Sequence, residues 1–303
     1  MNIANLDLNL LVSLDALLRE RSVTRAAERL GLTQPALSAA LRRLRAHFGD
    51  ELLTRVGNTY QLTPLAVFLL GRATIAMDGV ERVFDAKPEF DPELCTREFV
   101  VLCSDYSLSV AGAPVVAALA ARAPKARIRF RQPALAQIRS AADNLRTSDV
   151  GIHPHGFSVD LPHLDVFRDR WICIVAEGNE RVGDRLTVDD LTALPWVSAL
   201  DQSSTAYTPA HKQLQLQGAV IDIRVVTDSF LAVPAMVAGT DRVALLQERL
   251  ARAIPGDLGI RVLDCPFDAP PLREALWWHP LSEEDPEHRL LRSAFADAAL
   301  VLA

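Results

Sequence analysis

Apolar residues recur at helical spacing through the first fifty positions, and residues that cap or end helices interrupt them at two points. A first helix is predicted by apolar residues three or four positions apart, Leu8, Leu11, Leu14 and Leu18. Ser22 can accept hydrogen bonds from the free amides of a second helix beginning at Val23, and Gly31 supplies the left-handed residue that ends it. We therefore expect two helices before residue 32.

A third helix is predicted after Thr33, which can cap its first turn, and Pro35 there gives up an amide that has no intrahelical partner. One face is apolar, at Leu37, Leu41, Leu44 and Phe48. The other is polar, at Gln34, Ser38, Arg42 and Arg43. Arginine and glutamine pair bidentately with guanine and adenine in the major groove, and serine reaches base or phosphate. The order of parts predicts a helix-turn-helix DNA reader, and an ordinary amphipathic hairpin is the alternative.

A β hairpin is predicted between residues 52 and 63, where short β-prone runs flank a turn at Gly57 and Asn58. Arg55 and the turn are candidates for contact with phosphate or the minor groove, because they follow the predicted reading helix directly. The alternative is a solvated hairpin.

A long helix is predicted from Pro64 to about Lys87, since Thr63 and Pro64 form a helix start. Its apolar positions are Leu65, Phe68, Leu69, Ile75, Ala76, Val80 and Val83. A helix of roughly 22 residues spans about 33 Å. We expect this stripe to pair with the same helix of a second subunit, and residues 87–94 to form a hinge at Pro88.

From residue 96 onward, strands alternate with helices, which predicts two α/β lobes. The first lobe should hold strands at 98–103, 127–131 and 149–152 and helices at 106–122 and 135–146. Two strand pieces at 166–176 lead to the second, with strands at 196–199, 221–227 and 243–246 and helices at 205–217 and 230–238. The strand at 272–279 should return to the first lobe, before a final helix at 284–300. Open sheets of this kind bind small ligands at the carboxyl ends of their strands.

Polar residues gather at three predicted strand ends that face the cleft between the lobes, each at a helix entrance. At the first of them, Ser104 and Asp105, free amides and a hydroxyl point at one spot and would suit an anion. Each residue can also be explained as a helix cap that needs no ligand, and only their convergence favours a site. The candidate effector-binding residues are Ser104, Asp105, Gln132, Pro133, Gln202, Ser203, Thr205, Thr227 and Phe230.

The net charge of −6 would argue against a nucleic-acid partner if it were evenly spread. Residues 1–63, however, hold eight arginines against six acidic residues, a net charge of +2, which leaves −8 for the remainder. A mildly basic head on an acidic body fits a protein that docks one end on phosphates. Because the excess is small, we expect two or more heads to act together.

The sequence offers no established catalytic or metal-binding motif: GxSxG, HExxH, P-loop and GxGxxG patterns are all absent. His153 and His155, in the segment HPHGF, and nearby His163 invite a metal interpretation, but a metal needs three or four convergent ligands. We expect loop histidines there that are exposed or bonded to the backbone. Cys95, Cys103, Cys173 and Cys265 are scattered, as expected of reduced, buried thiols. The longest apolar run, around residues 114–121, is too short to span a membrane, so we expect a cytoplasmic protein.

The stretch from Leu6 to Pro64 resembles the winged helix-turn-helix of LysR-type transcriptional regulators, without interruption. The resemblance implies a long linker helix that pairs two subunits, and an effector domain similar to periplasmic solute-binding proteins. We expect 1–63 to be the DNA-binding domain, 64–91 the linker helix and hinge, and 92–303 the effector domain. The expected DNA contacts are Ser22, Thr24, Thr33, Gln34, Pro35, Ser38, Arg42, Arg43 and Arg55.

Residues 226–251 and 274–292 resemble one branch of that family, the regulators of nodulation and of aromatic-compound degradation. The branch implies an aromatic acid or phenol as effector. The family as a whole implies homodimers or homotetramers bound to double-stranded DNA, with RNA polymerase as a further partner. No cofactor is expected. The competing hypotheses are an enzyme on the solute-binding scaffold, for which no nucleophile has a nearby base, and a head that only dimerises.

Overall fold

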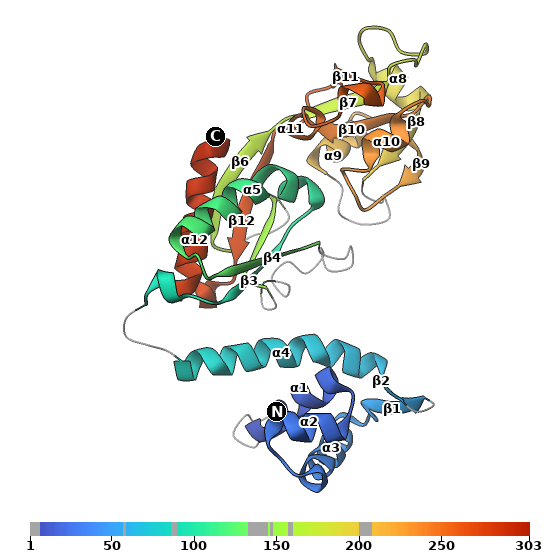
Figure 1. Cartoon of the computed structure of the whole chain (residues 1–303). Coiled ribbons are helices and arrows are strands. Elements are labelled where there is room, and N and C mark those ends of the chain that lie inside the picture. The colour runs from blue at the N-terminus through green and yellow to red at the C-terminus, as the bar shows by residue number, and fades with distance from the viewer. Residues whose placement is uncertain are drawn as a thin grey trace. The chain divides into compact units, whose positions relative to one another are not determined.

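The computed structural model describes residues 7–56, 59–85, 90–132, 145, 148–156, 160–199 and 208–303. The chain forms two compact units, Met1–Glu89 and Phe90–Ala303, and Figure 1 labels most helices and strands of each. The expected division into three domains, with boundaries after residues 63 and 91, stays a prediction. Within the described residues, no helix combines the length and apolar character needed to cross a membrane.

The first unit begins with three helices, α1 Leu8–Glu20, α2 Val23–Leu30 and α3 Gln34–Phe48, as the sequence predicts. The side chain of Ser22 caps α2, and Gly31 ends it with a left-handed φ of 64°. Thr33 caps α3 by accepting from the amide of Ala36 at 3.4 Å. The apolar faces of the three helices form one core, in which Leu37 is fully buried.

The hairpin and the long helix complete this unit. Strands β1 Leu53–Val56 and β2 Thr59–Leu62 pair antiparallel, which confirms the predicted wing, while its turn at residues 57 and 58 lies outside the described residues. Helix α4, Pro64–Asp85, buries Ala66 and Ala73 in the same core. Thr74, in the middle of α4, also donates a hydrogen bond to Asp15 of α1 at 3.2 Å, so the first half of α4 is fixed to the head.

The second unit contains two five-stranded sheets, each the centre of one lobe (Figure 1). The first lobe has the strand order β4-β3-β5-β12-β6, with β3 parallel to β4 and β5 and β12 antiparallel to its neighbours. Its elements are β3 Glu98–Leu102, α5 Asp105–Arg122, β4 Arg127–Arg131, β5 Val150–Pro154, β6 His163–Asp169, β12 Leu272–Trp278 and α12 Pro286–Leu302. The predicted parallel unit and returning strand are confirmed, and the predicted helix at 135–146 lies almost wholly outside the described residues.

The second lobe has the order β11-β7-β10-β8-β9. Its strands are β7 Trp171–Ala176, β8 Pro195–Ser198, β9 Asp222–Val226, β10 Val243–Gln247 and β11 Ile260–Asp264. Its helices are α8 Val188–Ala193, α9 Pro209–Leu216, α10 Val233–Val237 and α11 Glu248–Ala251. The second unit as a whole also has single 3-10 turns at Pro92–Leu94, Gly256–Leu258 and Pro280–Ser282. The sequence did not predict α8, α11 or β11. One continuous apolar core joins both lobes.

A buried ion-pair network in the first lobe is centred on Arg97. Arg97, only 10% exposed, bonds Asp285 at 2.8 Å and Glu287 at 3.0 Å at the start of α12, and it also pairs with Asp149 before β5. Burial disfavours the charged guanidinium, but the three carboxylates outweigh it and raise the pKa of Arg97 above its ordinary value. The network therefore ties β3, β5 and α12 together.

Candidate DNA interface and effector site

The polar face of α3 lies opposite its buried leucines. Gln34, Pro35 and Arg42 are exposed there and Ser38 is half-buried. Within the described residues, Arg42 forms neither a hydrogen bond nor an ion pair, so its five donors face solvent. The helix thus presents a guanidinium and an amide side chain that can meet a base edge or a phosphate.

The neighbouring arginines differ from Arg42, because they bond within the protein. Arg43 pairs with Asp7, the cap of α1, at 3.1 Å. A backbone hydrogen bond from Asn9, more than the pairing with Arg43, lowers the pKa of Asp7. Arg45 donates to the carbonyl oxygens of Glu51 and Leu53 at 2.8 and 3.0 Å, which fixes the end of α3 to the wing.

The predicted contacts on the helix entrances are engaged in capping. Ser22 Oγ accepts from the amide of Arg25 at 3.4 Å, and Thr33 caps α3 in the same way. Each hydroxyl keeps its own proton, so it can still donate to a phosphate oxygen. Thr24 is exposed in the first turn of α2.

The wing brings together two side chains, one of which the sequence interpretation missed. Arg55 on β1 and Tyr60 on β2 are direct partners in the antiparallel register, and both are exposed. Directly opposite residues project on the same face of a hairpin, so a phenol hydroxyl lies beside the predicted phosphate contact. The signal that could have found Tyr60 is the turn, which sets that register.

In the second unit, Asp105 joins the two lobes. Its carboxylate, at the start of α5, accepts from the hydroxyl of Ser229 at 2.6 Å and from the amides of Phe230 and Leu231, each at 3.1 Å. These donors belong to the second lobe, in the segment that leads into α10. The sequence suggests that an anion would fit at this entrance of α5, which stays a prediction. In the structure the chain's own carboxylate accepts hydrogen bonds from two amides of the facing lobe.

The other described effector candidates surround this junction. Gln132, after β4, donates to the carbonyl of Asp228 at 2.8 Å, and Thr227 Oγ1 accepts from the amide of Ser229 at 3.2 Å. Ser104 caps α5 and bonds Ser107. The ring of Phe230 lies 6.2 Å from that of Tyr106. Pro133, Gln202, Ser203 and Thr205 lie outside the described residues.

A buried polar cluster behind the junction was not predicted. Tyr106 donates its phenol proton to Asp169 at 2.6 Å, and Glu274 of β12 lies nearby with 3% exposure. Burial, with a smaller contribution from the charge of Asp169, raises the pKa of Glu274 to about 8, although a hydrogen bond from Ser107 lowers it. Burial and Asp169 also raise the pKa of Tyr106. The sequence interpretation looked for polar residues at the starts of helices. Glu274 lies within the strand β12, so it was not predicted to belong to a site.

An open depression of about 460 Å³ lies elsewhere, on the second lobe, beside β8 and β9. Its lining includes Arg181 and Arg224, which pair with Asp241 at 3.1 Å and Asp222 at 2.7 Å. The depression contains none of the predicted effector residues.

Comparison with known families gives two matches along the chain. Residues 8–66 match the model of the bacterial regulatory helix-turn-helix protein of the lysR family, and residues 95–300 match the LysR substrate binding domain. The first match covers α1 to the start of α4, and the second covers both lobes.

The similarity to individual relatives extends over nearly the whole chain. Nodulation protein D 2 of Rhizobium tropici is 32% identical over 304 residues, which cover 100% of this chain and 96% of that protein. Nodulation protein D 2 of Bradyrhizobium sp. (strain NC92) is 34% identical and covers 94% and 85%. Among solved structures, a probable transcriptional regulator from Pseudomonas aeruginosa has a TM-score of 0.71 at 25% identity and covers 97% of both chains. Full-length CbnR with its target DNA has a TM-score of 0.66 at 15% identity, over 98% and 100%, which shows the shared fold.

Proposed function

The chain belongs to the lysR family of bacterial DNA-binding transcriptional regulators, and we propose that two paired copies read DNA with α3 and the wing under control of a small molecule bound between the lobes. The family consists of regulators rather than enzymes, and an effector-binding domain accompanies the DNA-binding head. The residues that read DNA and bind the effector, and the effector's chemical class, are part of the proposal.

The observation that carries the DNA-reading part is the solvent-facing Arg42 on the exposed side of α3. Its guanidinium can bind a guanine edge or a phosphate without breaking a bond among the described residues, whereas Arg43 would have to leave Asp7. Arg55 and Tyr60 on the wing add donors for the adjacent phosphates. Gln34 and Ser38 supply further groups along the groove.

Pairing of two copies would follow from the exposed apolar side chains of α4. Val67, Phe68, Val83 and Phe84 are 56–83% exposed within the first unit. Burying large apolar side chains of this kind is favourable by about 1.5–3 kcal/mol each, which supports a second α4 as the covering surface. Two heads joined in this way would read two half-sites, and the family resemblance further implies tetramers.

The junction around Asp105 is the proposed effector site. Asp105, Gln132 and Phe230 form bonds or ring contacts between the lobes, so a ligand entering there must exchange with them. An aromatic acid or phenol suits this position, since its ring would lie near Phe230. Its carboxylate or phenol oxygen would replace the carboxylate of Asp105 as the acceptor for the amides of Phe230 and Leu231. The likeness to the nodulation proteins supports the aromatic class.

Control would then be a population shift between arrangements of the lobes. A ligand that binds one arrangement better stabilises it by its difference in affinity, and the paired heads hold DNA accordingly. RNA polymerase is the proposed further partner at the bound promoter.

The effector part is tested by thermal unfolding of the full-length protein against aromatic acids, phenols and aliphatic acids. A ligand at a hundredfold excess over its dissociation constant stabilises the native state by about 2.7 kcal/mol. We expect an aromatic acid or phenol to raise the unfolding midpoint of the wild type. The same ligand should raise the midpoint of Phe230→Ala by less, and that of the control variant Phe267→Ala by as much as in the wild type. A response to aliphatic acids alone would contradict the aromatic class.

A further inference from the structure

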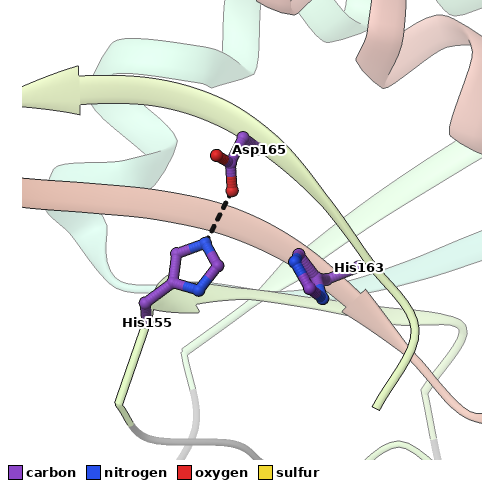
Figure 2. A group of neighbouring side chains, drawn as sticks. All are labelled: His155, His163 and Asp165. Carbon is purple, nitrogen blue, oxygen red and sulfur yellow. Dashed lines mark hydrogen bonds and ion pairs between the residues drawn. The ribbon is translucent and has the colours of Figure 1, made fainter. Parts of the chain in front are cut away.

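A group of potential metal ligands lies on the first lobe, away from the junction of Asp105 with the second lobe. His155 follows β5, while His163 and Asp165 belong to β6, and Figure 2 shows the three side chains together. One ligand atom from each lies within 4.8 Å of the others. The sequence alone offered histidines without a third converging ligand, and Asp165 supplies it.

The sheet itself brings these residues to one face. His163 and Asp165 are two positions apart on β6, so their side chains project on the same side. Their partners across β12 are Trp277 and Ala275, and Ala275 in turn pairs with His153 of β5. The amide of His155 then bonds the carbonyl of Arg273 at 3.0 Å, which continues the pairing. The ligands thus reach over β12 from both neighbouring strands.

Trp277 fixes the orientation of the imidazoles. Its ring centroid lies 5.2 Å from that of His155 and 4.6 Å from that of His163, and its indole nitrogen donates to the carbonyl of His153 at 2.9 Å. His153 stacks flat on the same indole and is not among the three ligands. An apolar wall behind two histidines limits their rotation, which lowers the entropic cost of binding an ion.

Hydrogen bonding also selects the ligand atoms. Nδ1 of His163 lies 3.2 Å from the carbonyl oxygen of Leu161, which can only accept, so Nδ1 carries the proton and Nε2 keeps its lone pair. Nε2 of His155 faces Oδ1 of Asp165 at 2.6 Å, the contact drawn as a dashed line in Figure 2. A cation placed there would take the position of the proton that those two atoms share.

We propose that His155, His163 and Asp165 bind a divalent transition-metal ion of the zinc class. Two imidazole nitrogens and one carboxylate suit Zn²⁺ or Ni²⁺, whereas Mg²⁺ and Ca²⁺ prefer oxygen ligands. Bonds of about 2.0–2.2 Å place neighbouring ligand atoms roughly 3–3.5 Å apart, a spacing that side-chain rotation can reach from 4.8 Å. His163 and Asp165 are exposed, so the ion can enter from solvent and water can complete its coordination. The bound ion ties β5 to β6.

The charge of Arg273 acts against this binding. Arg273 is exposed and lies two positions from Ala275 on β12, so its side chain projects on the face that carries the three ligands. A positive charge beside the site repels a cation. Arg273→Gln should therefore strengthen metal binding, whereas removal of a ligand should weaken it.

The test is calorimetric titration of Zn²⁺, and separately of Mg²⁺, into tag-free full-length protein that has been treated with chelator. We expect one Zn²⁺ per chain, no binding of Mg²⁺, and more than about tenfold weaker Zn²⁺ binding for His163→Ala and for Asp165→Asn. His47→Ala, which removes an exposed histidine of α3, is the matched control and should leave the affinity unchanged.

A second measurement separates binding from damage to the fold. Ni²⁺ should quench the fluorescence of Trp277, and this quenching should disappear in both ligand variants, whose unfolding midpoints without metal match the wild type. The proposal is overturned if Zn²⁺ binding does not saturate, or if both ligand variants bind it as tightly as the wild type. An equal loss of Zn²⁺ affinity in His47→Ala would also overturn the proposal, because it would mean that scattered surface histidines bind the ion.

Discussion

Glu274→Gln should stabilise the second unit at neutral and alkaline pH. The folded pKa of Glu274 is raised to about 8 from an ordinary value of 4.5, because the carboxyl is fully buried. Between those two values the unfolded chain has lost the proton and the folded chain keeps it. The contribution of Glu274 to the free energy of unfolding is therefore fully present below pH 4.5. It falls by about 1.4 kcal/mol per pH unit as the pH rises toward 8.

The interval of 3.5 pH units between 4.5 and 8 corresponds to about 5 kcal/mol, and a folded pKa one unit lower still leaves about 3 kcal/mol. Glutamine has the same shape and does not titrate. Within the described residues Oε2 of Glu274 has no partner, so the amide of glutamine leaves a donor unpaired there much as the neutral acid does. We expect equal stability near pH 4.5 and a more stable variant at pH 8.

The assay is urea unfolding of the full-length protein between pH 4.5 and pH 8, followed by tryptophan fluorescence. All four tryptophans, Trp171, Trp196, Trp277 and Trp278, lie in the second unit, so the signal reports that unit alone. Glu284→Gln, at a carboxyl whose side chain is 90% exposed, is the control and should keep the wild-type pH profile. Parallel pH profiles for Glu274→Gln and wild type would refute the reasoning.

Three further changes test other parts of the structure. Asp105→Asn should lower the free energy of unfolding of the second unit by about 1.5–3 kcal/mol, because three donors of the facing lobe lose a charged acceptor, and the same urea assay measures it. Arg97→Ala should cost about 3–5 kcal/mol in that assay, because its carboxylate partners are left without their cation; an unchanged midpoint would mean that the network contributes nothing. Phe84→Asp should shift the full-length protein toward monomer in sedimentation experiments, since it places a charge in the proposed α4 pairing surface; an unaltered dimer would exclude that surface at this position.

Local sequence signals were sufficient for the head. Ser22, Gly31 and Thr33 cap or end helices through bonds to residues within five positions, so their roles could be predicted without the fold. The strand at 127–131 was predicted with the bounds it has in the structure. Two short elements were not predicted: α8 is a six-residue helix held by the capping box of Thr187 and Asp190, and β11 is an edge strand whose five residues are half-buried or exposed.

The candidate sites depend on residues that are far apart in the sequence, and fewer of their contacts could be predicted from the sequence. Ser104 and Asp105 were correctly placed at the start of a helix, but the hydroxyl and the two amides that donate to Asp105 come from a segment 124 to 126 positions later. Arg42 and Arg43 are adjacent and chemically alike, and only the fold shows that Arg43 meets Asp7. The pairing of His155 with Asp165 similarly depends on how β5 and β6 flank β12.

Reading of DNA through the exposed face of α3 is the main functional proposal for this protein. Its most direct test is the affinity of the full-length protein for the duplex upstream of its own gene and for a scrambled duplex, by fluorescence anisotropy between about 50 and 200 mM salt. We predict a preference for the upstream duplex and a linear fall of log affinity with log salt. Arg42→Ala should reduce the preference by about 1–3 kcal/mol if it contacts a base, or the salt slope by about 1 if it contacts phosphate. Arg252→Ala, an equal charge change in the second unit, should alter neither. Equal affinity for both duplexes, or identical behaviour of the two variants, would contradict the account.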